Sequence, residues 1–188
     1  ALEHRNIAEL AQADNKHPLD WILDFGEQEN FETLFNAQIL NADEDAVLKL
    51  LKDANASIGL ADAGAHLFLF CDADYGLHLL GRWHRERGDF TLEEAVAALT
   101  AKPASIYGIK DRGLLKIGNF ADLLMFDPQT VGRGEKKRVT DLPAGASRLI
   151  RSVSGIHGIW VNGQQVADKA GLINNAIKSG HLLREFNQ

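Results

Sequence analysis

Ser57-Ile-Gly-Leu-Ala-Asp-Ala-Gly-Ala-His-Leu-Phe-Leu-Phe-Cys-Asp72 is the stretch that decides the fold of this chain. Its short apolar run, residues 58–60, is typical of a strand buried on both faces. The run then changes abruptly to small residues that carry Asp62 and His66. In parallel α/β proteins the working residues lie at the carboxyl ends of strands, where the loops converge. The stretch therefore predicts a buried strand that ends in a functional carboxylate and an imidazole.

The segments before and after this stretch favour an α/β architecture. Residues 43–52 place apolar side chains on one helical face, and a helix followed by a buried strand is the repeating unit of a βα barrel or a doubly wound sheet. Residues 32–40 predict another strand. Further helices are expected at residues 6–13, at 18–25 before Gly26, at 75–87 and at 91–100, where Thr91 and Glu94 predict a capping box, with a turn at 102–103 and a short helix ending at Gly108.

After Gly108 the sequence changes to short β-like runs separated by glycines. We therefore expect a domain boundary near Ile109, dividing the chain into residues 1–108 and 109–188. Asn162-Gly163 predicts a two-residue hairpin, because both residues accept the positive φ of a type I′ turn. The expected strands are residues 113–116, 121–126, 148–154, 156–161 and 164–167.

Two segments of this second part are not read as strands. Residues 132–143 carry several lysines and arginines and predict a solvated charged loop rather than a binding patch. The tail from Gly171 onward predicts a helix or an arm that packs on a partner.

Composition excludes several classes of protein. With 188 residues, 45% hydrophobic and 24% charged, the chain predicts a folded domain, and a net charge of −6 argues against nucleic acid as a partner. Its single cysteine, Cys71, allows no internal disulfide and fits a reducing, cytoplasmic compartment. No apolar run approaches the roughly 20 residues of a membrane helix, so no membrane is expected. The start at Ala1, without methionine, predicts a cut from a longer chain.

Several motifs resemble one known family in the order in which they occur. Gly59-Leu-Ala-Asp-Ala-Gly-Ala-His66 resembles the last-strand motif of the N-acyl-D-amino-acid deacylase (D-aminoacylase) branch of the amidohydrolase superfamily. Three later segments resemble the return from the barrel to the small β-domain and its terminal hairpin: Thr100-Ala-Lys-Pro-Ala-Ser-Ile-Tyr-Gly-Ile109, Asp111-Arg-Gly-Leu-Leu-Lys-Ile-Gly-Asn-Phe-Ala-Asp-Leu-Leu-Met-Phe-Asp-Pro128 and Val161-Asn-Gly-Gln-Gln-Val166. The resemblance implies an α/β fold, the C-terminal βα units of a (β/α)8 TIM-like barrel followed by a small β-sandwich subdomain.

The same resemblance implies a zinc site. Asp62 matches the family's metal ligand and general base, which orients a zinc-bound water, accepts its proton and passes that proton to the leaving nitrogen. One or two zinc ions are expected in the complete enzyme, with a small-molecule amide as the substrate. His66 and Asp72 are candidates for binding substrate or for supporting Asp62, and a purely structural role remains the alternative for both.

Other chemically active side chains are expected to be structural. Cys71 is interpreted as a small apolar residue rather than a nucleophile, because no group beside it stabilises a thiolate. Arg148 and Arg151 reach a substrate carboxylate only if the β-domain folds toward the barrel mouth. Packing or turn-anchoring roles are expected for His78, Trp83, His84, Asp122 and Asp127.

The departures from the family pattern limit the prediction. Ala61 stands where the family usually has serine, and no His-x-His pair occurs among the seven histidines. Because a catalytic zinc needs about three protein ligands, we expect this chain to be inactive alone and to need the missing N-terminal barrel portion. The prediction is the C-terminal segment of an N-acyl-D-amino-acid deacylase, with a homo-oligomer as one option. The alternatives are a dihydropyrimidinase-like or hydantoinase-like cyclic amidase and a non-catalytic structural module.

Overall fold

The computed structural model describes residue 2 and residues 5–37, 40–61, 63, 64, 66–173, 178–184 and 186. The chain forms two compact units, Ala1–Glu44 and Asp45–Gln188. The first is helical and the second combines helices with antiparallel strands, so the chain is α/β in class. The boundary expected near Ile109 is a different division and stays a prediction.

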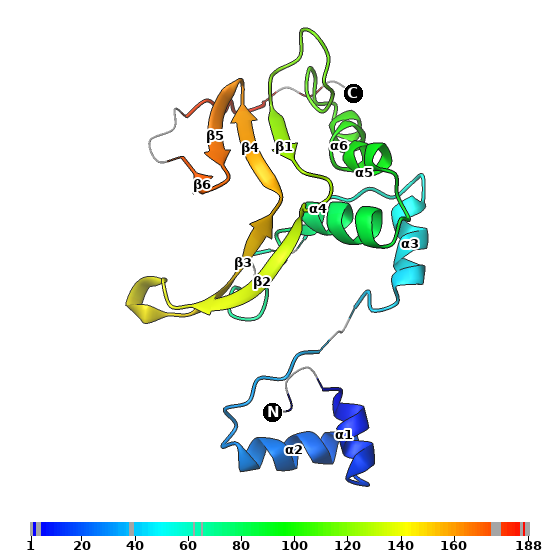
Figure 1. Ribbon diagram of the computed structural model, residues 1–188, viewed down its shortest axis with the longest axis vertical. Coiled ribbons are helices and arrows are strands. Elements are labelled where there is room, and N and C mark those ends of the chain that lie inside the picture. The colour runs from blue at the N-terminus through cyan, green and yellow to red at the C-terminus, as the bar shows by residue number, and fades with distance from the viewer. Residues whose placement is uncertain are drawn as a thin grey trace. The chain divides into compact units, whose positions relative to one another are not determined.

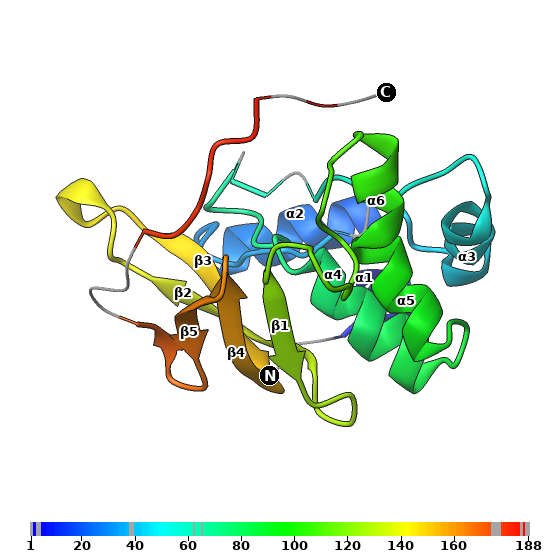
Figure 2. The same ribbon diagram turned by 90° about the horizontal axis from the view of Figure 1, so that it is seen from above.

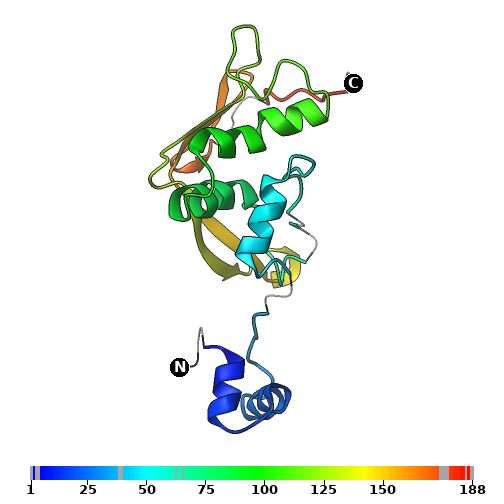
Figure 3. The ribbon, with the colours of Figure 1, turned by 90° about the vertical axis from the view of Figure 1, so that its right-hand side faces the viewer.

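The first unit contains two helices, α1 (Ile7–Ala13) and α2 (Pro18–Gln28), which cross each other at the blue end of the chain in Figure 3. Trp21 is 7% exposed, and its indole N–H donates a hydrogen bond of 2.8 Å to the Asp14 carboxylate. Its ring stacks on Phe25 with centroids 4.9 Å apart. This contact holds the two helices together, because it fixes an aromatic side chain of α2 against the end of α1.

Two expectations for this unit were wrong. The helix α2 continues past Gly26, which is buried and lies where an added Cβ would meet the Phe31 ring at 3.3 Å. The glycine therefore permits close packing of Phe31 instead of ending the helix. Residues 32–37 and 40 form no strand, although a strand was expected there.

The second unit begins with helices close to those expected from the sequence. They are α3 (Glu44–Lys52), α4 (Tyr75–His78), which continues into the π-helical segment η1 (Leu79–Glu86), α5 (Leu92–Leu99) and α6 (Ala101–Ile106). The capping box is confirmed: the Glu94 N–H donates to the Thr91 hydroxyl at 3.1 Å, and the Thr91 N–H donates to the Glu94 carboxylate at 2.9 Å. The turn expected at 102–103 is instead the first turn of α6, where Pro103 is tolerated because that turn's N–H groups have no helical acceptor.

The core of the second unit lies between η1, α5 and the strand region. Trp83 is 4% exposed and Val131 is fully buried. The cluster of buried side chains comprises Leu79, Leu80, Trp83, Phe90, Ala95 and Val131. The packing role expected for Trp83 is therefore confirmed.

Two antiparallel sheets follow. Strands β1 (Leu123–Phe126), β4 (Ile156–Val161), β5 (Gln164–Asp168) and β6 (Gly171–Leu172) form a sheet in the order β1-β4-β5-β6, and β2 (Gly132–Val139) pairs with β3 (Arg148–Ser154) in a separate ribbon. Figure 2 shows β1, β4 and β5 side by side. The hairpin at Asn162-Gly163 is confirmed, since both residues have positive φ, 48° and 78°.

Three strand-related expectations for this unit were wrong. The charged loop expected at 132–143 is the strand β2 over most of its length, and its basic residues follow each other without apolar alternation because a two-stranded ribbon has little core to cover. Residues 113–116 form no strand. Residues 58–60 also form no strand. A parallel barrel strand requires neighbouring strands on both sides. In the described part of the chain, the strands β1–β6 pair only with one another, so none is a neighbour of residues 58–60.

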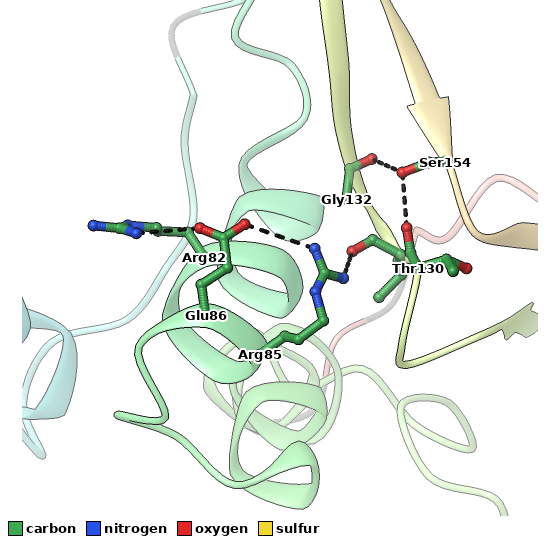
Figure 4. A network of polar contacts seen from close by, with 7 residues as sticks. Arg82, Arg85, Glu86, Thr130, Gly132 and Ser154 are labelled. Atoms are coloured by element: carbon green, nitrogen blue, oxygen red, sulfur yellow. Dashed lines mark hydrogen bonds and ion pairs between the residues drawn. The ribbon is translucent and has the colours of Figure 1, made fainter.

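The ribbon is continuous with the sheet, because β3 leads directly into β4 through Gly155 (Figure 1). Gly155 has φ +70°, and an added Cβ would lie 2.3 Å from the Val131 backbone nitrogen. Figure 4 shows how η1 is fixed at this junction: Arg85 donates a hydrogen bond to the Val131 carbonyl and contacts Glu86, while the Ser154 hydroxyl donates to the Thr130 carbonyl at 2.8 Å.

Candidate functional site

The predicted base, Asp62, lies outside the described residues, so its role stays a prediction. Its described neighbours are Ala61, which is half-buried, and Ala63 and Gly64, which are exposed. Gly64 has φ +90°, a left-handed conformation that favours glycine, so the turn after Asp62 uses the small residue that the motif supplies.

A cavity of about 640 Å³ adjoins this turn, because Ala63 and Gly64 form part of its wall. The rest of the wall comes from the loop before α4, from α4 and η1, and from Leu99, β1 and β3. Most of the side chains in the wall are apolar, and the charged ones are Asp74 and Arg151. The cavity has the volume of a typical small-molecule site, and its apolar wall suits an apolar group, with Asp74 and Arg151 as the charged part of the wall.

His66 is exposed, and its backbone starts a tight turn. The His66 carbonyl accepts hydrogen bonds of 2.8 Å from the Leu69 and Phe70 N–H groups. The imidazole lies 6.0 Å from the Phe70 ring, measured between centroids. The structure thus shows what positions His66, whereas its role toward substrate or Asp62 stays a prediction.

Asp72 belongs to a cluster of charges that joins this loop to the β2–β3 ribbon. Arg151 and Lys136 each place a side-chain nitrogen 3.8 Å from the Asp72 carboxylate. The Arg151 Nε lies 3.1 Å from the carboxylate of Asp74, and the Arg133 Nε lies 4.0 Å from it. These ion pairs join Asp72 to the ribbon, whereas its role toward substrate or Asp62 stays a prediction.

Asp74 is the residue of this cluster that sequence reasoning missed. Its side chain is only 10% exposed and that of Arg151 is 15% exposed. Within the described part of the chain, neither Asp74 carboxylate oxygen accepts a hydrogen bond and the Arg151 Nε–H donates none, so the two side chains meet as an ion pair only. The available signal in the sequence is the repeated acid in Asp72-Ala-Asp74 together with the basic run of β2.

The remaining candidates are held by structural contacts. Asp122 accepts a hydrogen bond of 2.8 Å from the Asn162 N–H, and it pairs with Arg112. Hydrogen bonds from the Gln129 N–H and then the Thr130 hydroxyl lower the pKa of Asp127. Both aspartates therefore anchor turns, as expected.

Cys71 and the two basic residues of β3 also have assigned surroundings. Cys71 is a free, half-buried thiol in the cavity wall. Arg148 donates two hydrogen bonds, of 2.7 and 2.8 Å, to Asp141, and Arg151 pairs with the loop. Both guanidinium groups thus have carboxylate partners within the chain.

The described residues do not form a metal site by themselves. Among them, no group of three or more His, Cys, Asp or Glu side chains lies together in a way that could hold an ion. Within the same part of the chain, no helix is long and apolar enough to cross a bilayer.

The profile of the amidohydrolase family matches residues 13–167. The chain belongs to the amidohydrolase family. This amidohydrolase chain is 43% identical over 99 residues to N-acyl-D-aspartate deacylase of Alcaligenes xylosoxydans xylosoxydans, an alignment that covers 53% of the chain and 18% of that deacylase.

Solved D-aminoacylases share the fold over nearly the whole chain. A D-aminoacylase mutant in complex with copper chloride superposes with a TM-score of 0.57 at 25% identity, covering 96% of this chain and 35% of that protein. A second D-aminoacylase, described with a binuclear metal centre, gives a TM-score of 0.53 at 26% identity, covering 91% of this chain and 33% of that protein. The amidohydrolase chain therefore spans about a third of the length of these structures.

Proposed function

We propose that this chain is the C-terminal part of a metal-dependent amidohydrolase that hydrolyses the amide bond of N-acyl-D-amino acids. One observation carries the proposal: the Gly59–His66 motif occurs in a chain of the amidohydrolase family that resembles N-acyl-D-aspartate deacylase and D-aminoacylases. These relatives, as named, release acyl groups from D-amino acids. The family match, residues 13–167, includes the motif's carboxylate, so we assign the same class of reaction here.

In this proposal the chain supplies the last βα units of a (β/α)8 barrel, residues 1–108, and a small β-sandwich subdomain, residues 109–188. Its surface supports a larger assembly: Leu115 is 89% exposed and Ile117 fully exposed, and β1 lies at the edge of its sheet with Leu124 and Met125 about half exposed. Large exposed apolar side chains beside an open strand edge favour contact with further polypeptide. The N-terminal barrel portion is the proposed occupant.

The proposed chemistry assigns one role to each candidate residue. A metal bound in the complete enzyme, one or two zinc ions, supplies an acidified water. Asp62 takes a proton from the attacking water and delivers it to the leaving nitrogen. His66 contacts the substrate or Asp62. Asp72 holds the loop that begins at His66, through its ion pairs with the ribbon.

The test is a deacylase assay on the complete protein and on this 188-residue chain. We expect the complete protein to hydrolyse N-acetyl-D-amino acids, to discriminate against the L-enantiomers, and to contain bound zinc. The isolated chain should be inactive and should bind zinc weakly. Hydrolysis of cyclic amides alone would favour a hydantoinase-like enzyme, and a complete protein without metal or amidase activity would favour a structural module. Either result would refute the proposal.

A further inference from the structure

The loop that follows Asp62 is held at four points by one element, the β2–β3 ribbon. At its start, the Leu149 N–H of β3 donates a hydrogen bond of 2.8 Å to the Leu67 carbonyl. One residue later, Arg138 of β2 donates to the Phe68 carbonyl at 3.1 Å and places its guanidinium 4.2 Å from the Phe68 ring centroid. These contacts fix the backbone directly after His66.

The far end of the loop is held by charge. Arg151 lies between Asp72 and Asp74 and also donates a hydrogen bond of 2.9 Å to the Gly134 carbonyl of β2. The Arg151 side chain is thus tied to its own ribbon on one side and to two loop carboxylates on the other. Lys136 adds a second cation beside Asp72.

The burial of this pair makes its geometry important. Asp74 and Arg151 are 10% and 15% exposed, so water screens them little. Without Arg151 the Asp74 carboxylate would keep, among the described residues, only Arg133, at 4.0 Å, and the loss of the nearer cation from a buried carboxylate is far less favourable than the loss of an exposed pair. The observed position of the loop therefore depends on Arg151 more than on Lys136, whose side chain is 42% exposed.

We propose that the β2–β3 ribbon is a clamp that sets the position of residues 66–74, and that Arg151 is its main positioning residue. This inference rests on the proposed function in one respect: the clamped loop begins four residues after Asp62, so its position limits where the catalytic carboxylate can lie. Arg151 acts through the loop and does not touch substrate in this assignment.

The chain contains its own reporter for the clamp. Cys71 is the single cysteine, it is half-buried, and it lies within the clamped loop. The rate at which a maleimide modifies its thiol therefore measures how often the loop opens. Arg148 provides a matched control, because it lies on the same strand but pairs with Asp141 on the ribbon itself.

The experiment compares Arg151→Gln with Arg148→Gln in the 188-residue chain, with circular dichroism to show that each variant is folded. We expect Arg151→Gln to raise the Cys71 modification rate by about tenfold, because removing one member of a buried pair favours local opening. Arg148→Gln should leave the rate unchanged. If Arg151→Gln does not fold, Arg138→Gln decides, since it removes a contact with Phe68 at the exposed surface and should also raise the rate.

Equal modification rates in the clamp variants and in the control would overturn the clamp, whatever the enzyme's activity. In the complete enzyme, Arg151→Gln should lower kcat, because release of the loop displaces both the base and His66 from their productive positions. A fall in kcat without faster Cys71 modification would also contradict the clamp. Absence of deacylase activity in the parent protein would instead refute the proposed function and leave the thiol measurement valid.

Discussion

Replacing Trp83 with alanine should remove most of the stability of the second unit. The side chain is 4% exposed and packs with Leu79, Leu80 and Phe90 in the core cluster. A buried tryptophan removes about 150–250 Å² from water, and about 25 cal/mol per Å² gives about 4–6 kcal/mol. Direct Trp→Ala substitutions cost about 3–5 kcal/mol. Since domains are stable by only about 5–15 kcal/mol, this one change should bring the unit close to unfolding.

The assay follows urea unfolding of the second unit alone. The chain has three tryptophans, and Trp21 lies in the first unit, so all variants carry Trp21→Phe and Trp160 of β4 reports by fluorescence. Trp83→Phe keeps one aromatic ring and should cost about 2 kcal/mol, at about 0.8 kcal/mol for each buried carbon lost. It remains measurable even if Trp83→Ala does not fold. A cost below about 1 kcal/mol for both variants would refute this description of the core.

Three further predictions concern the fold. Gly155→Ala should cost at least about 3 kcal/mol by urea unfolding, because positive φ and the Val131 backbone both oppose a Cβ. The control Gly145→Ala, at φ +71° but in open space, should cost only about 1 kcal/mol. Equal costs would disprove the close approach of Gly155 to Val131. Thr91→Ala should cost about 1 kcal/mol by removing the α5 cap, and Thr100→Ala, whose side chain caps no helix N–H, should cost less; the reverse order would contradict the cap assignment. The hydrogen bond from the Thr91 N–H, followed by the contact with Lys52, lowers the pKa of Glu94 in the folded chain. The stabilisation from ionised Glu94 is therefore complete above pH 4.5 and is lost as the pH falls through the lower pKa of the folded state. Glu94→Gln should flatten this part of the acid-unfolding curve, and an unchanged curve would exclude the effect.

Local signals predicted much of the second unit. The capping box at Thr91, the Asn162-Gly163 turn and the strands β3 and β4 were all found from the sequence, because each depends on residues close to one another in the chain. The strand expected at 58–60 and the loop expected at 132–143 failed for the opposite reason. Pairing depends on a neighbour elsewhere in the chain, which apolar runs and charge content do not reveal.

The candidate site was predicted unevenly for the same reason. Asp72 lies close to the motif in the sequence, but its partners Arg151 and Lys136 come from strands about 60 to 80 residues later. Asp74 was missed because its burial becomes visible only when the ribbon covers it. The pattern Asp-x-Asp followed by a basic run indicates an ion-pair cluster. Only the structure shows that the loop of residues 66–74 lies against the β2–β3 ribbon.

The most direct test of the account is the turnover of the complete enzyme after Asp62→Asn. Asparagine keeps the shape of aspartate but cannot accept a proton, so turnover of an N-acetyl-D-amino acid should fall by at least about 10²-fold, the contribution of a positioned acid–base group. Circular dichroism should show an unchanged fold, and Asp53→Asn, at an exposed carboxylate after α3, should retain full activity. Unchanged turnover in Asp62→Asn would contradict the assignment of Asp62 as the base.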